Sequence, residues 1–495
     1  MSSWPRLLLT LHTFAFLAVG ASQAAAQDLF ANPFASAEVL RAQRGSLPNA
    51  TLRLRYEYSG DKTAGQPPHE LIIDVAPDWA HVRRTDRQML YDFHLGRALE
   101  LRDGGTFVSR NLMSDVVFRV QERQNRAYLM AVIRKAGAAS PMDGCDTETE
   151  LGVAIGVLKD PAAVEVKQSS ATTSIECNGR AVGVLESGLG DKAPAALWPV
   201  LAREITMHPS LRALLAGNAP PRRVEALFKV AGTSKALSWR LVAAEPITAP
   251  YPLAANLVNA TATLVNEAAA PGLGDLAAEA VAGRAHGGPP TLASWEAEVG
   301  RLAKEKGPAA AAFAAWQALN MFPLAVQACQ SGAMSPLCSA LRGVGATATS
   351  DAAVRALFDI IIAEQLGRPA DAVAAMLGAR SSPYSDHPAV GASFALALQS
   401  GGDGVQKQAQ AAGLPSDAKP LHVRALQAYP YNPAYWTDLG DYYAKGYDLW
   451  TAYTLYDVAF SLPMPDAQKG NAALAGKRSF AARIRNDFPA FFLAK

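Results

Sequence analysis

The stretch that most constrains the fold of this chain is residues 432–465, because its spacing predicts two short antiparallel helices in close contact. The sequence there is NPAYWTDLGDYYAKGYDLWTAYTLYDVAFSLPMP. Gly440 and Ala452 are small where the two helices would touch, and larger side chains would fill the groove beside that contact. Gly446 is expected to supply the left-handed cap at the end of the first helix. The pattern therefore predicts a helical hairpin near the end of the chain.

This hairpin resembles a tetratricopeptide (TPR) repeat, whose spacing is W-x2-L-G-x2-Y…A-x3-F…A. The matched positions are Trp436, Leu439, Gly440, Tyr443, Ala452, Tyr456 and Ala459. The closing proline falls at position 463 or 465 instead of 464, which departs from the pattern. Two degenerate repeats accompany it, one that begins at Trp295 and one whose tail ends at Pro430. The resemblance implies a helical solenoid that binds other chains.

From residue 253 onward the sequence predicts helices alone, about a dozen residues long and joined by short connections that contain Gly or Pro. The predicted helices cover residues 253–270, 276–285, 292–306, 309–319, 354–366, 370–377, 391–398 and 422–428, before the hairpin described above. Residues 253–495 are therefore expected to form an all-α, TPR-like solenoid of helical hairpins.

Residues 49–246 show the alternation of β-strands instead. Between positions 52 and 59 apolar and polar side chains alternate, which is typical of a strand with one solvent-facing side. Further strands are predicted at residues 71–75, 79–84, 89–94, 98–102, 106–109, 163–166, 172–177, 181–185, 224–230 and 236–244. Residues 27–48 are interpreted as a leader into this domain. Its end is marked by three prolines, Pro246, Pro250 and Pro252.

A helix is expected to cover one face of this antiparallel meander. Ser114 can cap it, and its apolar stripe consists of Val116, Val117, Val120, Ala127, Met130 and Ala131. The predicted fold class is therefore an α+β N-terminal domain, a meander with a covering helix, followed by the all-α solenoid. In its order of elements the N-terminal domain resembles the half-barrels of periplasmic lipoprotein carriers, which implies a concave apolar face that holds acyl chains.

Residues 1–26 predict a secretory signal peptide. Arg6 precedes an apolar run at residues 7–20, and three alanines at positions 24–26 offer a cleavage site before Gln27. The run is too short for a membrane span, and no later stretch reaches roughly 18 apolar residues without a charge. After cleavage near Ala26 the mature chain is expected in the periplasm or outside the cell, with no transmembrane span.

Composition limits the number of domains and the class of partner. At 495 residues the chain is too long for one core, so we expect two or three domains. The chain has 46 Lys and Arg against 44 Asp and Glu, a net charge of +2. A balance so close to zero argues against nucleic acid as the main partner.

Four cysteines fit an oxidising compartment. Two lie in each half of the chain, which favours the pairs Cys145–Cys177 and Cys329–Cys338 over crossed pairings. A metal site is the alternative, because four acidic residues between positions 143 and 150 surround Cys145. No histidine stands at ligand spacing nearby, so structural disulfides are favoured and no metal is expected.

The motifs of common enzymes are incomplete. His69 opens the run HELII, which lacks the second histidine of a zinc-protease helix. Ser187 lies in LESGLG, where Leu185 replaces the glycine that a nucleophile elbow requires. No catalytic residue and no cofactor are therefore expected.

One group of side chains has the composition of a general base with its partners. His81 and His94 lie on neighbouring predicted strands, with Asp92 and Asp78 nearby. Solvent-facing positions on the strands are the favoured interpretation of these residues.

Aromatic side chains crowd the hairpin at residues 432–465. Helical periodicity assigns Trp436, Tyr443 and Tyr456 to its core. Rings outside the core could line a binding groove, since aromatic residues are enriched at binding hot spots. The rings assigned to such a groove are Tyr442, Tyr447, Trp450 and Tyr453.

These observations favour a non-enzymatic, exported protein whose helical domain binds a protein or peptide partner in the cell envelope. The alternative is a carrier or sensor of a lipid or another apolar ligand, which the N-terminal half-barrel would hold. A hydrolase centred on His81 and His94 is a third interpretation.

Overall fold

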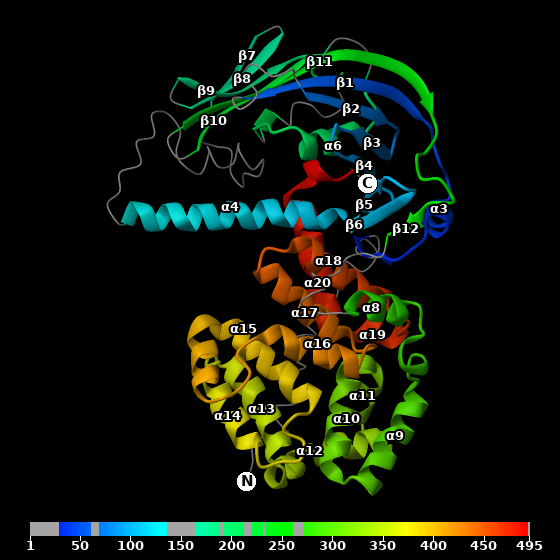
Figure 1. Cartoon of the computed structure of the whole chain (residues 1–495), viewed down its shortest axis with the longest axis vertical. Coiled ribbons are helices and arrows are strands. Elements are labelled where there is room, and N and C mark those ends of the chain that lie inside the picture. The colour runs from blue at the N-terminus through cyan, green and yellow to red at the C-terminus, as the bar shows by residue number, and fades with distance from the viewer. Residues whose placement is uncertain are drawn as a thin grey trace. The chain divides into compact units, whose positions relative to one another are not determined.

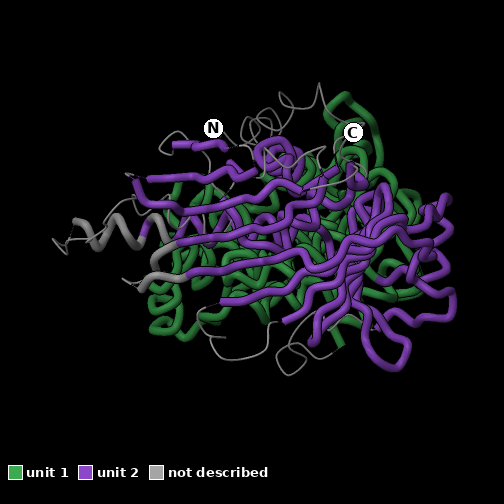
Figure 2. The backbone as a smooth tube through the Cα atoms, turned by 90° about the horizontal axis from the view of Figure 1, so that it is seen from above, with its two compact units in different colours: residues 1–33, 263–479 green, residues 34–262, 480–495 purple. Residues whose placement is uncertain are grey.

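The structure is a computed structural model that describes residues 29–60, 69–135, 165–169, 171–177, 179–188, 192–208, 210–211, 219–230, 233–260 and 272–493. The chain forms two compact units (Figure 2). The sheet unit comprises Phe34–Ala262 and Phe480–Lys495, and the helical unit comprises Met1–Pro33 and Thr263–Ser479. The predicted signal peptide lies outside the described residues. The expected fold class, an α+β domain followed by an all-helical region, is confirmed.

A twelve-stranded sheet is the centre of the sheet unit. Its strands are β1 (Ala50–Gly60), β2 (His69–Val75), β3 (Trp79–Arg83), β4 (Gln88–Asp92), β5 (Arg97–Arg102), β6 (Thr106–Asn111), β7 (Glu165–Gln168), β8 (Thr172–Cys177), β9 (Arg180–Glu186), β10 (Arg223–Val230), β11 (Thr233–Ala249) and β12 (Val258–Asn259). Their order is β12-β6-β5-β4-β3-β2-β1-β11-β10-β9-β8-β7. Every described neighbour pair is antiparallel except β12 with β6, so the predicted meander is confirmed.

One pairing in this sheet is not visible in the sequence pattern. β1 lies between β2 and β11, and Tyr56 therefore opposes Leu71 on one side and Leu241 on the other. β11 extends beyond the strand expected at residues 236–244 and continues through Pro246, next to a shift in register. A proline has no N–H to donate, and such an irregular position tolerates it.

The sheet is covered on both faces. On one face α6 (Leu197–Glu204) buries Val200 and Leu201 in the same core as Ile73, and Figure 1 shows α6 beneath the curved sheet. On the opposite face α3 (Ala37–Arg44) buries Leu40 beside Trp79. The segment interpreted as a leader thus contributes a helix to the core.

The long helix α4 (Leu112–Lys135) differs from the prediction in its cap. Asn111 caps it, because its side-chain oxygen accepts a hydrogen bond of 2.9 Å from the backbone two residues later. Ser114 lies inside the helix and donates to the carbonyl of Asn111 at 2.7 Å. Val116 and Val117 are buried, whereas residues 118–125 are half-buried or exposed. The side chains of Ala127, Met130 and Ala131 lie outside the described part.

A short strand replaces the start of a predicted helix. The sequence predicts a helix over residues 253–270, but Val258 and Asn259 form β12. The N–H of Val258 donates to the carbonyl of Gly105 at 3.0 Å, at the start of β6. This bond joins distant parts of the chain, so helical periodicity could not indicate it. Residues 261–271 lie outside the described part.

The helical unit is built from paired helices. Its elements are α8 (Leu273–Val281), η3 (Ala285–Gly287), α9 (Leu292–Glu305), α10 (Pro308–Met321), α11 (Pro323–Gln330), α12 (Pro336–Ser350), α13 (Ala352–Gln365), α14 (Asp371–Ala379), α15 (Pro388–Ala411), α16 (Ala418–Ala428), α17 (Pro433–Lys445), α18 (Leu449–Ser461), α19 (Pro465–Gly470) and the start of α20 (Ala472–Asp487). α9 pairs with α10, α13 with α14, α15 with α16 and α17 with α18 (Figure 1). Contacts of α13 with α15 and of α16 with α17 link successive pairs, so the region is consistent with a helical solenoid.

Helices α11, α12, α19 and α20 lie where the sequence predicts none. Three of them begin with a proline, at Pro323, Pro336 and Pro465. Proline is well tolerated in the first turn of a helix, since its missing N–H would have no partner there. Within the described residues no single helix has the length and apolar composition of a membrane span; α10 and α11, bent by 113°, meet the criterion only as a pair.

The hairpin of α17 and α18 confirms the predicted contact. A Cβ atom on Gly440 would lie 2.3 Å from Cε1 of Tyr456, so the two helices meet at the glycine. Ala452 is buried at the same contact. The expected left-handed cap at Gly446 is wrong, because its φ is −81°. Tyr447 adopts the left-handed conformation instead, with φ +67°.

The predicted disulfide between Cys329 and Cys338 is present, with Cα atoms 5.0 Å apart. It joins the end of α11 to the start of α12. Cys177 is also disulfide-bonded, and Cys145, its predicted partner, lies outside the described residues.

Candidate functional site

Three aromatic side chains near the turn between α17 and α18 form the candidate site, which we call the aromatic patch. They are Tyr442, Tyr447 and Trp450. Trp450 is 39% exposed, and both tyrosines are half-buried. Rings that combine an apolar body with an accessible polar edge are well suited to partner binding.

Tyr453, the fourth ring assigned to a groove, belongs to the core. Its side chain is 3% exposed. Its ring centre lies 6.4 Å from that of Phe30 and 5.2 Å from that of Tyr456. Phe30 also stacks on Phe460 at 4.1 Å, so the first described residues of the chain cover this face of α18. The sequence pattern of the hairpin could not show that cover.

Of the three rings expected in the core of the hairpin, two are buried and one is half-buried. Trp436 is fully buried, and its indole N–H donates to the carbonyl of Pro430 at 2.7 Å. Tyr456 is buried against Gly440. Tyr443 is only half-buried, so it borders the aromatic patch.

The backbone at Tyr447 is strained. Its N–H donates to the carbonyl of Ala444 at 3.1 Å, and the N–H of Asp448 donates to that of Tyr443 at 3.0 Å. These two bonds form a Schellman motif, in which the left-handed position is usually glycine. An L-residue with a side chain costs about 1–2 kcal/mol in that conformation. An aromatic ring therefore occupies a position where glycine would be more stable.

Polar groups surround the tyrosines of the patch. The rings of Tyr442 and Tyr443 are perpendicular, with centres 5.5 Å apart, and Nζ of Lys419 lies 5.5 Å from the centre of the Tyr443 ring. Burial, together with the charge and hydrogen bond of Asp417, raises the pKa of Tyr442, which keeps its phenol neutral. The hydroxyl of Tyr443 is buried and has no hydrogen-bond partner in the described part of the chain. The site therefore contains unused hydrogen-bonding capacity.

A carboxyl cluster on α17 was not predicted. Burial and the nearby charges of Asp441 and Glu364 raise the pKa of Asp438 to about 8, against the attraction of Lys477. Asp441 accepts hydrogen bonds from the hydroxyl of Tyr456 and the ammonium of Lys477. Near neutral pH, Asp438 is therefore largely protonated and can donate a hydrogen bond. The sequence concealed this cluster because Glu364 and Lys477 come from α13 and α20.

The predicted general-base group does not assemble. His81 is buried in β3, and burial lowers its pKa to about 4, so its expected solvent-facing position is wrong. His94 is exposed in the turn after β4. Asp92 accepts from Arg44 at 2.7 Å, and Asp78 also pairs with Arg44. The two carboxylates thus hold an arginine, and neither orients an imidazole.

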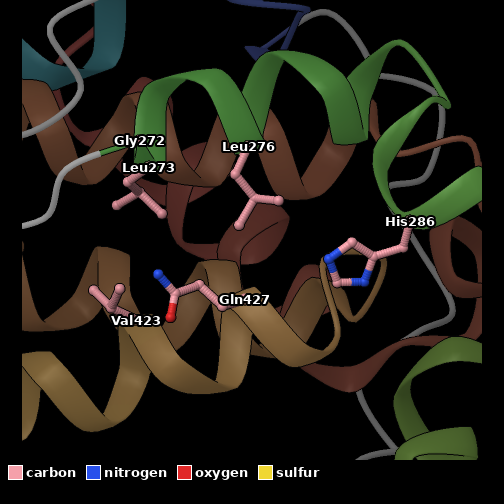
Figure 3. A pocket seen from close by; sticks show the side chains of 6 residues that line it. All are labelled: Gly272, Leu273, Leu276, His286, Val423 and Gln427. Carbon is pink, nitrogen blue, oxygen red and sulfur yellow. The ribbon is translucent and has the colours of Figure 1, made fainter.

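A pocket of about 260 Å³ lies between α8, η3 and α16. Figure 3 shows the six residues that line it: Gly272, Leu273, Leu276, His286, Val423 and Gln427. None of them was predicted as a site residue, because the lining joins two segments more than a hundred positions apart in the sequence.

The search for metal ligands and the comparisons with known proteins point to no further functional residue among those described. In the part of the chain that is described, no group of three or more His, Cys, Asp or Glu side chains is placed to hold a metal ion. Comparisons with protein-family models, with curated proteins and with solved structures find no match to this chain.

Proposed function

We propose that this protein is an exported, non-enzymatic interaction protein whose helical unit binds a protein or peptide partner through the aromatic patch. The observation that carries the proposal is Tyr447, an aromatic residue at a left-handed backbone position that lies between Tyr442 and Trp450 in the sequence. Backbone strain that persists in a fold is a reason to look for a function of the strained residue.

The aromatic composition of the patch supports binding more than folding. Trp450 leaves 39% of its surface exposed, so part of its apolar area contributes nothing to the described core. Burial of such a ring in a partner stabilises a complex by roughly 25 cal/mol for each Å² removed from water. Rings also lose little conformational entropy on binding, since they rotate about only two side-chain bonds.

The repeat-like architecture supports the same proposal. The hairpin of α17 and α18 has the close glycine contact that the TPR spacing implies, and successive helix pairs contact one another. We propose that these pairs form a TPR-type solenoid. Solenoids of helix pairs present extended surfaces that bind polypeptide segments.

Export is proposed from the sequence and the disulfide. Residues 1–26 have the composition of a signal peptide. The bond between Cys329 and Cys338 suits an oxidising compartment. The cell envelope or the exterior is therefore where a partner should be sought.

The decisive experiment replaces Tyr447 with glycine. Tyr447→Gly should relieve the backbone strain and raise the free energy of unfolding by about 1 kcal/mol. The same change should weaken capture of the envelope partner, because it removes a ring of the patch. Unfolding is measured in urea, and capture by quantitative mass spectrometry of polypeptides retained from envelope extract. A variant that is more stable and binds as well as the parent would contradict the proposal.

A second variant tests the other two rings. Tyr442→Ala combined with Trp450→Ala should reduce capture at least tenfold, since hot-spot aromatics each contribute about 2 kcal/mol or more. Phe118 of α4 is the matched control, because it is also 39% exposed but lies in the sheet unit. Phe118→Ala should leave capture unchanged. Equal losses in both variants would mean that general surface apolarity causes the retention.

The alternative function, a carrier of a lipid or another apolar ligand, conflicts with the packing of the sheet. Val200 and Leu201 of α6 are fully buried in the core on the face where an acyl chain would lie. A carrier would have to move α6 to admit a ligand. Acyl species that co-purify with the gently isolated protein would support that alternative.

A further inference from the structure

The pocket between α8, η3 and α16 shares no residue with the aromatic patch, and it combines an apolar wall with two polar side chains. Leu273, Leu276 and Val423 form the wall. Figure 3 shows Leu276 pointing from α8 toward Gln427 on α16, while the ring of His286 enters from η3. A ligand in this space would meet apolar and polar groups together.

The polar groups of the pocket are not used by the protein. Gln427 and His286 have no side-chain hydrogen bond or ion pair with the residues that the structure describes. Among the described residues, no Lys, Arg, Asp or Glu side chain lines the pocket. An uncharged lining with unused donors and acceptors favours a neutral ligand that can both donate and accept.

The backbone beside His286 is anchored by its neighbours. Its backbone is left-handed, with φ 50° and ψ 32°. The carbonyl of the preceding residue, Ala285, accepts a hydrogen bond of 2.9 Å from the hydroxyl of Tyr431. Ala285 is itself buried. The fold therefore anchors the backbone next to His286, whose own side chain is exposed at one end of the pocket.

We propose that this pocket binds an aliphatic side chain together with the amide group beside it. The volume of about 260 Å³ falls below the roughly 300–1,000 Å³ of pockets for drug-sized molecules, and it suits a single residue. The primary amide of Gln427 can accept from the backbone N–H of such a residue and donate to the carbonyl of the same residue, because both groups point to one side of an extended backbone. The apolar wall then contacts the aliphatic group.

A leucine residue has this chemistry, either as a free small amide or within a polypeptide. The probes are N-acetyl-leucine amide, which represents the first source, and the capped peptide acetyl-Gly-Leu-Gly-amide, which represents the second. N-acetyl-glycine amide lacks the aliphatic group and is the reference. Methyl groups of the full-length protein report binding by nuclear magnetic resonance.

The leucine amide should shift the methyl signals of Leu273, Leu276 and Val423 selectively, with a Kd on the order of millimolar. The methyl groups of Leu366 and Val39, which are exposed elsewhere, should not move. The glycine amide should bind at least tenfold more weakly, because it forgoes the apolar contact. Tighter binding of the capped peptide than of the leucine amide would identify a residue within a polypeptide as the ligand, and the reverse order would identify a free amide.

Gln427→Leu should weaken binding of the leucine amide about fivefold, since it removes one hydrogen-bonding group while keeping a similar volume. Gln410 of α15 is also exposed and lies outside the pocket lining, so Gln410→Leu should have no effect. Val423→Trp should abolish binding by filling the space. Thermal unfolding of each variant shows whether it is folded.

Equal shifts with the glycine amide and the leucine amide would overturn the proposal, and so would unchanged affinity in the folded Gln427→Leu variant. The double variant Tyr442→Ala, Trp450→Ala should bind the leucine amide like the parent. Loss of the aromatic-patch function would therefore be distinguishable from loss of this pocket.

Discussion

The sheet unit and the helical unit bury polar groups in different ways. Most of the described Asp, Glu and Arg side chains that are buried lie in the sheet unit. They are Arg44, Asp74, Asp92, Arg97, Arg203 and Glu204, whereas the helical unit has Asp457. In the sheet unit Nε of Arg44 donates to Asp92 at 2.7 Å, with both side chains fully buried. The hydroxyl of Tyr251 donates to the same carboxylate at 2.7 Å. These charges satisfy one another and fix α3 to the sheet.

The helical unit also contains a buried neutral network. The amide of Gln317 donates to the hydroxyl of Tyr435 at 2.7 Å and accepts from Asn432 at 2.7 Å. This network ties α10 to the start of α17. The comparison teaches that a dense group of charges is not by itself a functional site, because in the sheet unit such groups are already committed to structure.

Aromatic residues give the same lesson. In the sheet unit the guanidinium of Arg203 lies 5.6 Å from the ring centre of Phe93, 5.5 Å from that of Phe491 and 5.6 Å from that of Phe492. These rings enclose a buried cation and anchor the C-terminal residues 480–493. In the helical unit, Trp450 remains partly exposed. The solvent accessibility of a ring, more than its residue type, distinguishes a structural role from a proposed binding role.

The largest expected effect comes from breaking a buried charge pair in the sheet unit. Arg44→Ala leaves the carboxylate of Asp92 buried without its guanidinium, and it should lower the free energy of unfolding by about 3–5 kcal/mol. The pair of Arg240 and Glu57 is exposed, so Arg240→Ala should cost at most about 1 kcal/mol. Urea unfolding measures the stability loss of both variants, and hydrogen exchange in β3–β5 reports the local effect. Similar losses would contradict the distinction between buried and exposed charges.

Acidification should destabilise the helical unit through half-buried His387 and buried His422. Burial lowers the pKa of His387 and of His422 to about 4 in the folded state, and repulsion from Arg424 adds to the shift of His387. The unfolded chain binds protons below about pH 6.5, so stability is complete above that pH and falls as the pH approaches 4. Each histidine should account for about 3 kcal/mol of that loss at pH 4.

Guanidinium unfolding at pH 7 and pH 4 measures this loss. His422→Gln, which can keep a hydrogen bond to Gln399, should flatten the pH dependence of the helical unit. His81 has a folded-state pKa of about 4 in the sheet unit, so His81→Gln should flatten only the unfolding of that unit. A pH dependence that His422→Gln leaves intact would show that other groups cause it.

Removal of the disulfide should have a smaller effect. Cys329→Ala with Cys338→Ala opens a loop with a sequence separation of 9, which corresponds to about 2.5 kcal/mol in the chain-entropy model. Thermal unfolding of the double variant and of the reduced parent should agree. If hydrogen exchange in α11 and α12 does not increase, the bond does not stabilise this part of the unit.

The smallest effect tests the contact between α17 and α18. Gly440→Ala places a methyl group against Tyr456 and should cost about 1–2 kcal/mol. A Cβ atom on Gly343 in α12 would have no described neighbour within 4 Å, so Gly343→Ala should instead stabilise the protein by about 0.5–1 kcal/mol. The denaturant midpoints show whether each variant is less or more stable than the parent. Stabilisation by Gly440→Ala would mean that the helices can separate at low cost.

Several elements of the fold could be predicted because their signals are local. The alternation in residues 52–59 identified β1, and the spacing of Gly440 and Tyr456 identified the helix contact. Cys329 and Cys338 are close in sequence, so their pairing could also be predicted. In contrast, α3 was taken for a leader, because its buried face is defined only by strands far along the chain.

The candidate site was predicted in part for the same reason. Helical periodicity separated Trp436 from Trp450, since both lie on regular helices. It did not distinguish Tyr453, which Phe30 covers, from the exposed rings. It also did not predict the left-handed conformation of Tyr447. The pocket of His286 and Gln427 had no signal in the sequence, because no motif links η3 to α16.

The sequence by itself determined most strands of the sheet unit and the helical character of the C-terminal region, and it determined the close contact of α17 with α18. The tertiary structure decided that β11 lies beside β1, that α6 covers the sheet and that Tyr453 is buried while Trp450 is not. Periodicity records which face of an element is apolar. What covers that face depends on segments distant in sequence, and only their packing in three dimensions brings them together.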